Sequence, residues 1–489
     1  MTELRFDSAA AQEAAVDVVI IGAYSSDESV PVIPESASGV NAAFGGELSA
    51  RLAEIGHEGS ASTVAKLPAP DGLAANSLFV VGLGAQDDVD TEVLRRAVAT
   101  GVRATFGRDT VAVAVEGDDE AVATGASLGT YKFDDFKTDE ADDVPPQSVT
   151  VLGTTAEVVS RVEALTAGVF AARDWLNTPA NYLRPPMFAT EIERAADELG
   201  LEVETLDVEA LKTGGYGGTL AVGGGSEAGP RLVRIMYRPD GADKHIALVG
   251  KGITFDTGGI SLKPPQGMWD MKGDMGGAGA VVGAILSIAR LGLPINVTAT
   301  VALAENMPSG SAYRPGDVVT ARNGKTIEVL NTDAEGRMVL SDALSRAAED
   351  EPDALYDVAT LTGGAVISLG ARTMGLMGTP AETARVQRLG DETGERGWAM
   401  PFPEDVKKNM ESSIADVSQC AQGMKRDGHM LQGGIFLSHF VPEALPWAHL
   451  DIAGPADSDS AFGYLVKGGT GFPVRTLVAV VEDWLAEQS

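Results

Sequence analysis

The chain has 489 residues, of which 44% are hydrophobic and 22% are charged. At about 100–200 residues per domain this length indicates two or three domains, and we expect two. The composition excludes an intrinsically disordered chain, because such chains combine low hydrophobicity with high charge. There are 37 Lys and Arg residues and 70 Asp and Glu residues, which gives a formal net charge of −33. Nucleic-acid-binding proteins usually carry a basic face, so we do not expect nucleic acid as a partner.

Cys420 is the single cysteine of the chain. One cysteine excludes an intramolecular disulfide framework and any cysteine-clustered zinc or iron–sulfur site, and it fits a reducing compartment. The first residues lack a basic leader followed by an apolar core. No uninterrupted apolar run approaches the length of about 18–20 residues that spans a bilayer. We therefore expect a soluble, cytoplasmic protein that does not associate with a membrane.

The first third of the chain alternates between short apolar strands and amphipathic helices, which is typical of an α/β domain with a parallel sheet. The helix expected at 156–176 ends at turn-forming residues and a proline. We place a domain boundary within this helix, between an N-terminal domain of residues 1–165 and a second domain of residues 166–489. The expected strands cover 17–22, 78–81, 111–115 and 149–152, and the expected helices cover 44–55, 93–104 and 156–176.

The second domain also alternates between strands and helices, so it is expected to be α/β as well. We expect strands at 246–249 and 297–303, helices at 277–291 and 340–348, and a closing helix at 474–485.

Charged residues in unusual surroundings gather between Lys251 and Arg337, in segments that follow apolar strands. Open α/β sheets bind ligands at the carboxyl ends of their strands. The glycine-rich run 250–259 follows the strand expected at 246–249, and we interpret it as a loop that carries Lys251 and Asp256. Glycine permits close backbone approach and positive φ, so such a loop can fold tightly around a small charged ligand.

Three further carboxylates follow. Asp274 directly precedes a helix of small residues, and Asp333 and Glu335 are two positions apart, so an extended segment would project both toward one side. Four carboxylates in one buried site repel one another unless cations pair with them. Two divalent ions held about 3.5–4 Å apart would remove this repulsion, polarise a carbonyl group and lower the pKa of a shared water. The pattern therefore favours metal-dependent hydrolysis.

The heptapeptide NTDAEGR at 331–337 resembles the signature of the leucyl aminopeptidase family of dinuclear metallopeptidases, without a departure. Further segments that resemble the family are DTGG at 256–259, SLKP at 261–264, DMGG at 274–277, ENMPSG at 305–310, RPGD at 314–317 and TLTG at 360–363. The resemblance covers the chain from about residue 177 to the C-terminus, whereas the N-terminal part shares only its α/β character. It implies a smaller N-terminal α/β domain and a larger C-terminal catalytic domain with a central mixed sheet flanked by helices.

The resemblance implies an aminopeptidase that hydrolyses N-terminal residues from peptides, with leucine and other apolar residues preferred. The reaction would use a bridging hydroxide held by two divalent ions per subunit, Mn²⁺ or Zn²⁺. Family members form hexamers with the catalytic domains at the centre, so a homohexamer is expected here. One ion would be held by Lys251, Asp256, Asp274 and Glu335, and the other by Asp256, Asp333 and Glu335, so that Asp256 and Glu335 bridge the two.

The resemblance also implies catalytic roles for Lys263 and Arg337. Lys263 would stabilise the developing oxyanion. Arg337 would hold a bicarbonate ion that accepts the proton of the attacking water and passes it to the leaving amine. The positions that resemble substrate-binding residues are Lys263, Met271, Thr360, Leu361 and Ala453, and they indicate a medium-sized apolar pocket.

A lysine ligand must be neutral, because an ammonium group has no lone pair and its reference pKa is about 10.4. Burial and two adjacent dications would both lower the pKa of Lys251, and metal uptake would be coupled to loss of its proton. Lys263, in contrast, should stay protonated. The ligand set contains neither thiolate nor imidazole, which by itself leaves manganese, magnesium and zinc open.

Simpler interpretations exist for each residue alone. Aspartates in glycine-rich loops are more often turn formers than ligands, single lysines are more often surface residues, and Arg337 alone could pair with Glu335 or another carboxylate. The combination of carboxylates favours the metal site. None of the five histidines shows the HExxH spacing of a zinc protease. We interpret them as structural, and the resemblance suggests a supporting role near the site for His449.

Two other classes of function remain open at this point. Carboxylate-rich metal pairs also hydrolyse phosphate esters, and release of phosphate rather than leucine would identify that activity. Some relatives of the family are reported to bind DNA. The charge of −33 weighs against such a role here, and a gel shift at low salt would test it.

Overall fold

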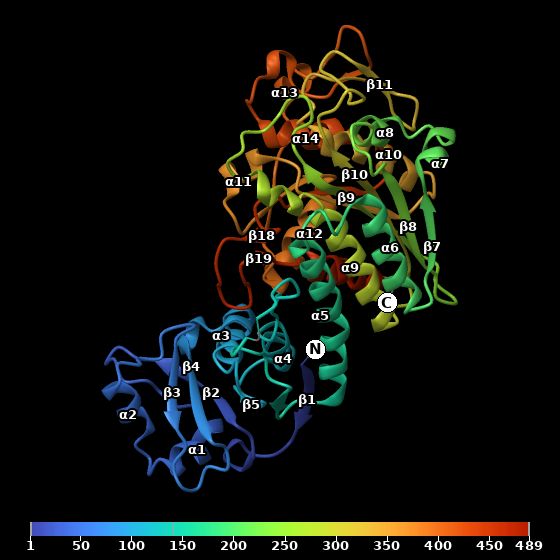
Figure 1. The fold of residues 1–489 in the computed structure, drawn as a ribbon. Coiled ribbons are helices and arrows are strands. Elements are labelled where there is room, and N and C mark those ends of the chain that lie inside the picture. The colour runs from blue at the N-terminus through green and yellow to red at the C-terminus, as the bar shows by residue number, and fades with distance from the viewer. Residues whose placement is uncertain (1, 140, 488–489) are drawn as a thin grey trace. The chain divides into compact units, whose positions relative to one another are not determined.

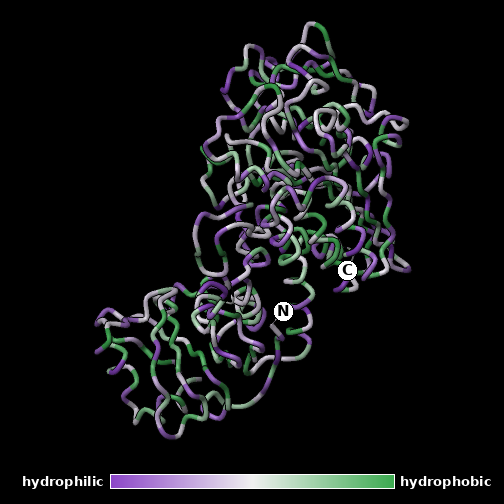
Figure 2. The backbone as a smooth tube through the Cα atoms, in the orientation of Figure 1, coloured by the Kyte–Doolittle hydropathy of each residue, from purple (hydrophilic) through white to green (hydrophobic). Residues whose placement is uncertain are grey.

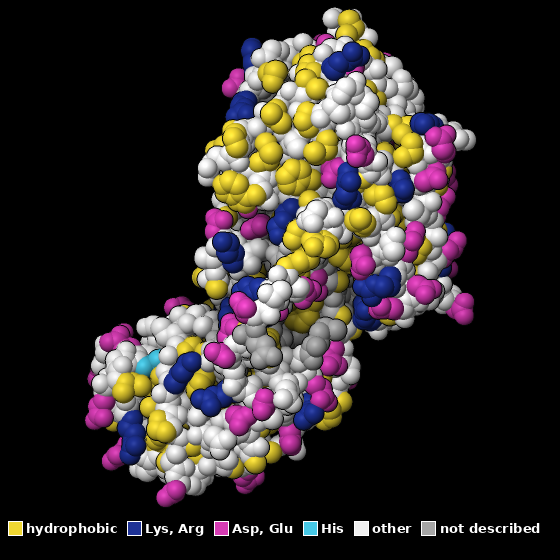
Figure 3. All heavy atoms as spheres, viewed as in Figure 1, with side chains coloured by type: hydrophobic (Ala, Val, Ile, Leu, Met, Phe, Trp, Pro, Cys, Tyr) yellow, Lys and Arg dark blue, Asp and Glu magenta, His cyan; other side chains and the backbone are white. Residues whose placement is uncertain are grey.

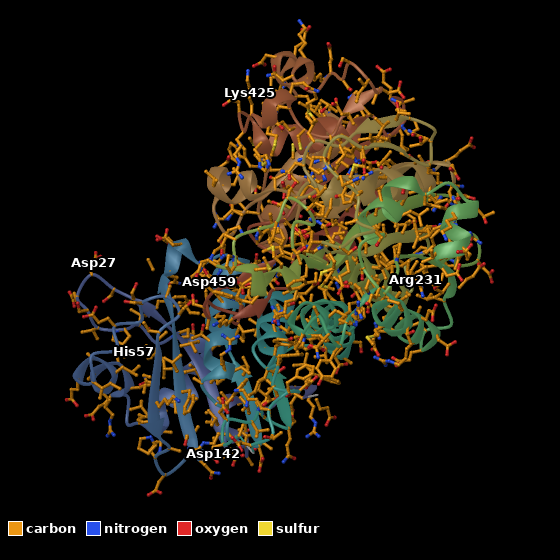
Figure 4. All side chains as sticks on the ribbon, turned by 45° about the horizontal axis from the view of Figure 1, so that its top comes forward. Asp27, His57, Asp142, Arg231, Lys425 and Asp459 are labelled. Atoms are coloured by element: carbon orange, nitrogen blue, oxygen red, sulfur yellow. The ribbon has the colours of Figure 1, made fainter. Side chains whose placement is uncertain are left out.

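The structure is a computed structural model that describes residues 2–139 and 141–487, and the chain divides into two compact units (Figure 1). Residues 1–166 with 459–467 form the N-terminal unit, and residues 167–458 with 468–489 form the C-terminal unit. The segment Asp459–Lys467, whose first residue is labelled in Figure 4, thus groups with the N-terminal unit. A boundary at 165/166 between independently folding domains stays a prediction.

The N-terminal unit is built on a six-stranded sheet in the order β1-β6-β5-β2-β4-β3. All neighbouring strands are parallel except β3, which runs antiparallel to β4. The strands are β1 Glu3–Asp7, β2 Val18–Ser25, β3 Val64–Pro68, β4 Ser77–Ala85, β5 Thr110–Ala114 and β6 Ser148–Leu152. The helices are α1 Ser38–Ala43, α2 Leu48–Glu54, α3 Thr91–Arg103, α4 Asp119–Leu128 and the first half of α5 Ala156–Asn177, with short 3₁₀ helices η1 Ala11–Glu13, η2 Glu35–Ala37 and η3 Gln86–Asp88.

Alternation along β2 explains the layers of this unit. Successive side chains of a strand point to opposite faces of the sheet. Val18 and Ile20 belong to a core that includes α3 and α4, whereas Val19 and Ile21 belong to a core that includes α1 and α2. Both faces of β2 are therefore buried, and hydrophobic colouring follows the strands of this sheet (Figure 2).

The helix expected at 44–55 is shorter in the structure, because α2 covers only Leu48–Glu54 and the preceding helix α1 ends at Ala43. Gly45 and Gly46 lie between them with φ of +71° and +80°. This left-handed conformation ends a helix, and glycine adopts it without strain.

The C-terminal unit is built on an eight-stranded mixed sheet in the order β15-β14-β17-β13-β9-β10-β8-β7. The four central strands β17, β13, β9 and β10 are parallel, so their carboxyl ends share one edge. The strands are β7 Glu202–Leu206, β8 Arg231–Tyr237, β9 His245–Asp256, β10 Asn296–Asn306, β13 Ala354–Ala359, β14 Met374–Gly378, β15 Gly397–Ala399 and β17 Trp447–Asp451. Short ladders are formed by β11 Val318–Thr320, β12 Thr326–Glu328 and β16 Val417–Ser418, and by β18 Asp457–Ser458 and β19 Gly468–Gly469.

Helices flank the large sheet. On one face Val249 of β9 shares a core with Val339 of α10 and Phe436 of α14. The next residue, Gly250, points to the other face, where a Cβ would lie 2.7 Å from the backbone of Ala278 in α9. The helices are α6 Pro185–Asp197, α7 Val208–Thr213, α8 Gly217–Gly223, α9 Gly276–Leu291, α10 Glu335–Ala348, α11 Gly363–Leu369, α12 Pro380–Thr393, α13 Glu404–Lys408, α14 His429–Ser438 and α15 Val474–Ala486, with 3₁₀ helices η4 Met268–Gly273 and η5 Gln422–Met424.

The strand β9 is longer than expected. It continues through Lys251 to Asp256, so most of the run interpreted as a glycine-rich loop is strand. Gly250 and Gly252 fit there because their Cβ positions are occupied by α9 and by Leu303 of β10. Glycine in the middle of a strand often marks such a close approach.

One helical stretch of the described residues, Met268–Leu291, is long and apolar enough to cross a membrane by length and composition, although charged residues interrupt it. Of its most apolar window, 78% is buried inside the protein. It comprises η4 and α9, and nearly every residue of α9 is buried. We therefore interpret it as a core helix.

Candidate metal centre

The expected metal ligands lie at the edge where the parallel strands end. Lys251 and Asp256 are on β9, and Asp256 is its last residue. Asp274 lies between η4 and α9, and Glu335 is the first residue of α10. Asp333 lies in the turn before α10, so the segment from Asp333 to Glu335 is not extended as expected. It is this turn that directs both carboxylates to the same site.

Three carboxylates form a compact group. Asp256, Asp333 and Glu335 each offer an oxygen, and these oxygens lie within 4.8 Å of one another. Asp256 and Glu335 are buried, and Asp333 is half-buried. Such a group of hard oxygen donors suits a divalent cation.

Lys251 connects Asp274 to this group. Its Nζ lies 2.7 Å from Asp274 Oδ1 and 2.9 Å from Glu335 Oε1, and it donates a hydrogen bond of 2.9 Å to the carbonyl oxygen of Thr360. The side chain of Lys251 is 3% exposed. An ammonium group thus lies between two carboxylates, at a place that a metal cation could also occupy.

Lys263 connects the other pair. Its Nζ lies 2.7 Å from Asp256 Oδ2 and also forms an ion pair with Asp333. Its side chain is 21% exposed, in contrast to that of Lys251. All five expected ligands and Lys263 therefore belong to one network of charges.

The electrostatics show that the carboxylates exceed the positive charges around them. Burial raises the pKa of Asp274 well above its ordinary value, and it raises the pKa of Asp333, with help from Asp256 and Glu335, to about 6. Of the four carboxylates, only Glu335 has a lowered pKa. Burial raises this pKa, but the two lysines outweigh burial and bring it to about 2. Additional cations would stabilise this cluster in its ionised form.

The charge state of Lys251 differs from the expectation. Burial lowers its pKa, but the carboxylates of Asp274 and Glu335 raise it more, so the net shift is upward. The protein residues alone therefore keep Lys251 protonated. The pKa of Lys263 is also raised, because its carboxylate partners outweigh burial, which agrees with its expected charge.

Unsatisfied oxygens show that these residues fit a metal. Asp274 Oδ2 and Glu335 Oε2 are buried and have no hydrogen-bond partner among the described residues. Buried polar atoms are normally paired, and an unpaired one indicates a missing ion or water. The two free oxygens, together with the group of three carboxylates, supply the donors that divalent ions require.

Asn306, for which the sequence suggested no role, holds Asp256 in place. It is the last residue of β10 and is paired in register with Asp256. Its Nδ2 donates to Asp256 Oδ1 at 2.8 Å and to the carbonyl oxygen of Thr332 at 2.9 Å. Asn306 thereby connects β9 to the turn that carries Asp333. The sequence signal that could have identified it is the segment ENMPSG at 305–310, which contains Asn306 and resembles the family.

Gly258 and Gly259 allow the two loops to approach. Their φ values are +85° and +64°. A Cβ at Gly258 would lie 2.9 Å from Asp333 Oδ1, and one at Gly259 would lie 2.7 Å from Asn306 Oδ1. Both the backbone conformation and the space therefore require glycine.

Arg337 lies in the first turn of α10 and is buried. Its Nη1 donates to the carbonyl oxygen of Gln419 at 2.6 Å, and its guanidinium carbon lies 5.9 Å from the ring centre of Phe436. Among the described residues no carboxylate is within ion-pair distance of Arg337, and its Nε has no hydrogen-bond partner. The simple alternative, a salt bridge with Glu335, is therefore not observed.

Gln419 is a second residue that the sequence did not reveal. Its Oε1 accepts hydrogen bonds from the backbone N–H groups of Leu330 and Asn331, and its Nε2 donates to the carbonyl oxygen of Ala334. The side chain thus supports the turn between the two carboxylates of the signature. The next residue, Cys420, is buried, and burial raises the pKa of its thiol. The loop beyond it is exposed and carries Lys425 (Figure 4).

The expected substrate-binding residues lie beside this network. The hydroxyl of Thr360 donates to Asp274 Oδ1 at 2.7 Å. The backbone N–H groups of Leu361 and Ala453 both donate to Asp451 Oδ1 at 3.2 Å, so these two segments meet. Met271 is in η4, and its carbonyl oxygen accepts the N–H of Asp274 at 3.3 Å.

Two family models match the chain. The catalytic domain of the cytosol aminopeptidase family matches residues 170–478, and the N-terminal domain of the same family matches residues 20–140. The chain is 48% identical over 484 residues to a probable cytosol aminopeptidase of Nocardia farcinica, covering 96% of this chain and 95% of that one. It is 46% identical to a probable cytosol aminopeptidase of Streptomyces avermitilis, covering 99% and 98%.

Two solved structures are also similar to this chain. The bottromycin maturation enzyme BotP in complex with Mn is similar with a TM-score of 0.85 and 36% identity, covering 96% of this chain and 100% of that one. A mutant of tomato leucine aminopeptidase is similar with a TM-score of 0.86 and 32% identity, covering 98% and 96%. The chain therefore has two α/β units and a carboxylate cluster, and it is similar to these proteins over nearly its whole length. The chain belongs to the cytosol aminopeptidase family, and it is a metal-dependent hydrolase that acts on the N-terminal peptide bonds of peptides.

Proposed function

We propose that this aminopeptidase works with two divalent ions per subunit, and that leucine and other apolar residues are its preferred N-terminal residues. The observation that carries the proposal is the convergence of five ligand-type side chains on one cluster in which two carboxylate oxygens have no hydrogen-bond partner in the described part of the chain. Lys251, Asp256, Asp274 and Glu335 would hold one ion, and Asp256, Asp333 and Glu335 would hold the other.

When bound, the ion pair would supply Lewis-acid chemistry, which polarises the scissile carbonyl group and makes a shared water available as hydroxide. The similarity to a solved structure that contains Mn supports manganese, and zinc remains the alternative. The protein's part is to hold the ligands in place. Asn306 and the N–H of Gly258 do this for Asp256, and Thr360 does it for Asp274.

The two lysines would serve in opposite charge states. Lys251 is protonated when only protein residues surround it, and it would lose its proton on metal uptake, because a ligand must offer a lone pair. Lys263 is less buried, and carboxylates raise its pKa. It would keep its charge and stabilise negative charge on the substrate oxygen.

Arg337 would hold a bicarbonate ion. Its guanidinium group is buried without a carboxylate partner among the described residues, and a buried cation of this kind needs an anion. A planar guanidinium group suits a planar oxyanion, which it can bind through two parallel hydrogen bonds. A bicarbonate held there could take the proton of the attacking water and deliver it to the leaving amine.

The substrate's N-terminal side chain would enter a pocket lined by Met271, Thr360, Leu361 and Ala453, beside Lys263. The relatives' name supports a cytoplasmic location. The homohexamer stays a proposal from the resemblance to the family, and exposed hydrophobic side chains that gather on the C-terminal unit around α11 offer a surface for contact with another copy (Figure 3). In this helix the neighbouring residues Val366 and Ile367 are 39% and 87% exposed, and a contiguous apolar patch of this kind marks a protein contact site.

A reconstitution experiment tests the proposal. The purified protein is assayed with leucine amide before and after chelation, and again after addition of Mn²⁺ or Zn²⁺, with elemental analysis at each stage. We expect chelation to abolish activity and readdition to restore it as two ions bind per subunit. Full activity with one ion or none would contradict the dinuclear site. Preference for amides of acidic or basic residues would contradict the apolar pocket.

A further inference from the structure

Asp451, the last residue of β17, is fully buried at the same sheet edge as the metal cluster. Its Oδ1 accepts hydrogen bonds from the N–H groups of Leu361 and Ala453, both at 3.2 Å, and also from the N–H of Thr362 at 3.4 Å. Its Oδ2 accepts the hydroxyl of Thr362 at 2.6 Å. One carboxylate therefore binds two separate loops.

These loops begin where strand pairing stops. The ladder between β13 and β17 ends with the pair Ala359 and Asp451, and one further bond joins the N–H of Ile452 to the carbonyl oxygen of Ala359 at 2.8 Å. Beyond that point the segments that follow β13 and β17 are no longer paired as strands, so their backbone N–H groups need other acceptors. Buried N–H groups need an acceptor, and the Asp451 carboxylate provides it.

The first of these loops leads to the metal cluster. Thr360 accepts the hydrogen bond of Lys251 through its carbonyl oxygen and donates its hydroxyl to Asp274. On the other side, the hydroxyl of Thr362 accepts the N–H of Ala365 at 3.1 Å, which fixes the start of α11. The loop 360–362 is therefore held between Asp451 and the metal cluster.

Side-chain contacts also hold the part of β17 that precedes Asp451. His449, two residues earlier on β17, is paired across the ladder with Asp357 and lies 2.6 Å from it, Nδ1 to Oδ1. The indole N–H of Trp447 donates to Asp357 Oδ2 at 2.7 Å. All of these side chains are buried. Side-chain pairing thus locks β13 against β17 just before the two loops begin.

We propose that Asp451 is a positioning residue that sets the shape of the pocket for the substrate's N-terminal side chain. It does so by holding the backbones of Leu361 and Ala453, two residues assigned to the pocket in the proposed function, at a fixed separation through one carboxylate oxygen. The inference rests on the pocket assigned in the proposed function. Asp451 does not touch the substrate, and its effect reaches the reaction through the two loops.

Selectivity distinguishes this role from general support of the fold. An apolar pocket contributes to binding of a leucyl side chain but hardly to that of a glycyl residue, which has no side chain to place. A loosened pocket should therefore weaken the reaction of leucine amide and spare that of glycine amide. Loss of metal ligands or of folded protein would reduce both reactions equally.

The experiment compares Asp451→Asn, Thr362→Val and Thr362→Ser in the full-length, metal-loaded enzyme. Asp342→Asn is the matched control, because Asp342 is an equally buried carboxylate that accepts the N–H groups of Thr219 and Arg322 away from the pocket. For each variant kcat and KM are measured with leucine amide and glycine amide, together with the metal content and the Tm.

We expect Asp451→Asn and Thr362→Val to lower kcat/KM for leucine amide relative to glycine amide by about tenfold, the size typical of apolar pocket contacts. Most of the change should be in KM. Thr362→Ser keeps the hydroxyl and should retain the wild-type ratio, and Asp342→Asn should lower the Tm without changing the ratio.

An unchanged ratio in both Asp451→Asn and Thr362→Val, or an equal fall for the two substrates, would overturn the inference. If Asp451→Asn does not fold, the inference is tested by comparing the substrate ratio of Thr362→Val with that of Thr362→Ser. A wild-type enzyme that hydrolyses no leucine amide would instead overturn the proposed function, so the two failures can be distinguished.

Discussion

Replacing Asn306 with alanine should weaken metal binding by about 10- to 100-fold, as is typical for residues that orient metal ligands. The substitution removes the hydrogen bond to Asp256 Oδ1 at 2.8 Å and the one to the carbonyl oxygen of Thr332 at 2.9 Å. A hydrogen bond to a charged group contributes about 1.5–3 kcal/mol and one to a neutral group about 1 kcal/mol. If about half of this sum appears in metal binding, the loss is about 1.3–2 kcal/mol, which is about an 8- to 30-fold change.

The assay is activity with leucine amide as a function of free Mn²⁺ in a metal buffer, together with calorimetric titration of the chelated protein. The variant's activation curve should shift to higher Mn²⁺, while kcat at saturating metal recovers most of its value. Asn296→Ala is the matched control, since Asn296 is at the opposite end of β10, where its Nδ2 donates to the carbonyl oxygen of Ala242 at 3.0 Å. An activation curve for Asn306→Ala that coincides with that of wild type would refute the reasoning.

Three further predictions concern Lys251, Gly258 and His429. Lys251→Met should inactivate the enzyme and destabilise the chelated protein by about 3–5 kcal/mol, because two buried carboxylates lose their partner; denaturant unfolding in chelator measures this, and unchanged stability would contradict it. Gly258→Ala should reduce both activity and Tm, because φ is +85° and the new Cβ would lie 2.9 Å from Asp333 Oδ1; wild-type values for both would be inconsistent with the tight turn. Burial, together with Arg337, lowers the pKa of His429 to about 4. The folded protein therefore keeps His429 neutral and loses stability as the pH falls from about 6.5 towards 4; His429→Asn should flatten the dependence of Tm on pH in this window, and an unaltered profile would count against the assignment.

The sequence predicted the α/β class, the two-part organisation and the residues that gather at the sheet edge. Asp256, Asp333 and Glu335 could be found because they lie in short segments that resemble the family and follow apolar strands, and ligands bind where parallel strands end. The local conformation was harder to predict. Lys251 lies in a strand because its glycine neighbours pack against α9 and β10, and only the tertiary structure shows this.

Residues that act through strand pairing were missed. Asn306 and Asp451 are the last residues of β10 and β17, and their roles arise from the strands that pair with β10 and β17 in the sheet. The pairing of distant segments is not encoded in a local pattern. For the same reason the sequence did not indicate that Asp459–Lys467 groups with the N-terminal unit, where Arg103 donates to the carbonyl oxygen of Gly463 at 2.7 Å.

Anomalous diffraction from crystals of the manganese-loaded enzyme tests the central claim most directly. The account predicts two anomalous peaks per subunit, both in contact with Asp256 and Glu335, with Asp274 and Lys251 beside one peak and Asp333 beside the other. A single peak, or peaks outside this cluster, would contradict it.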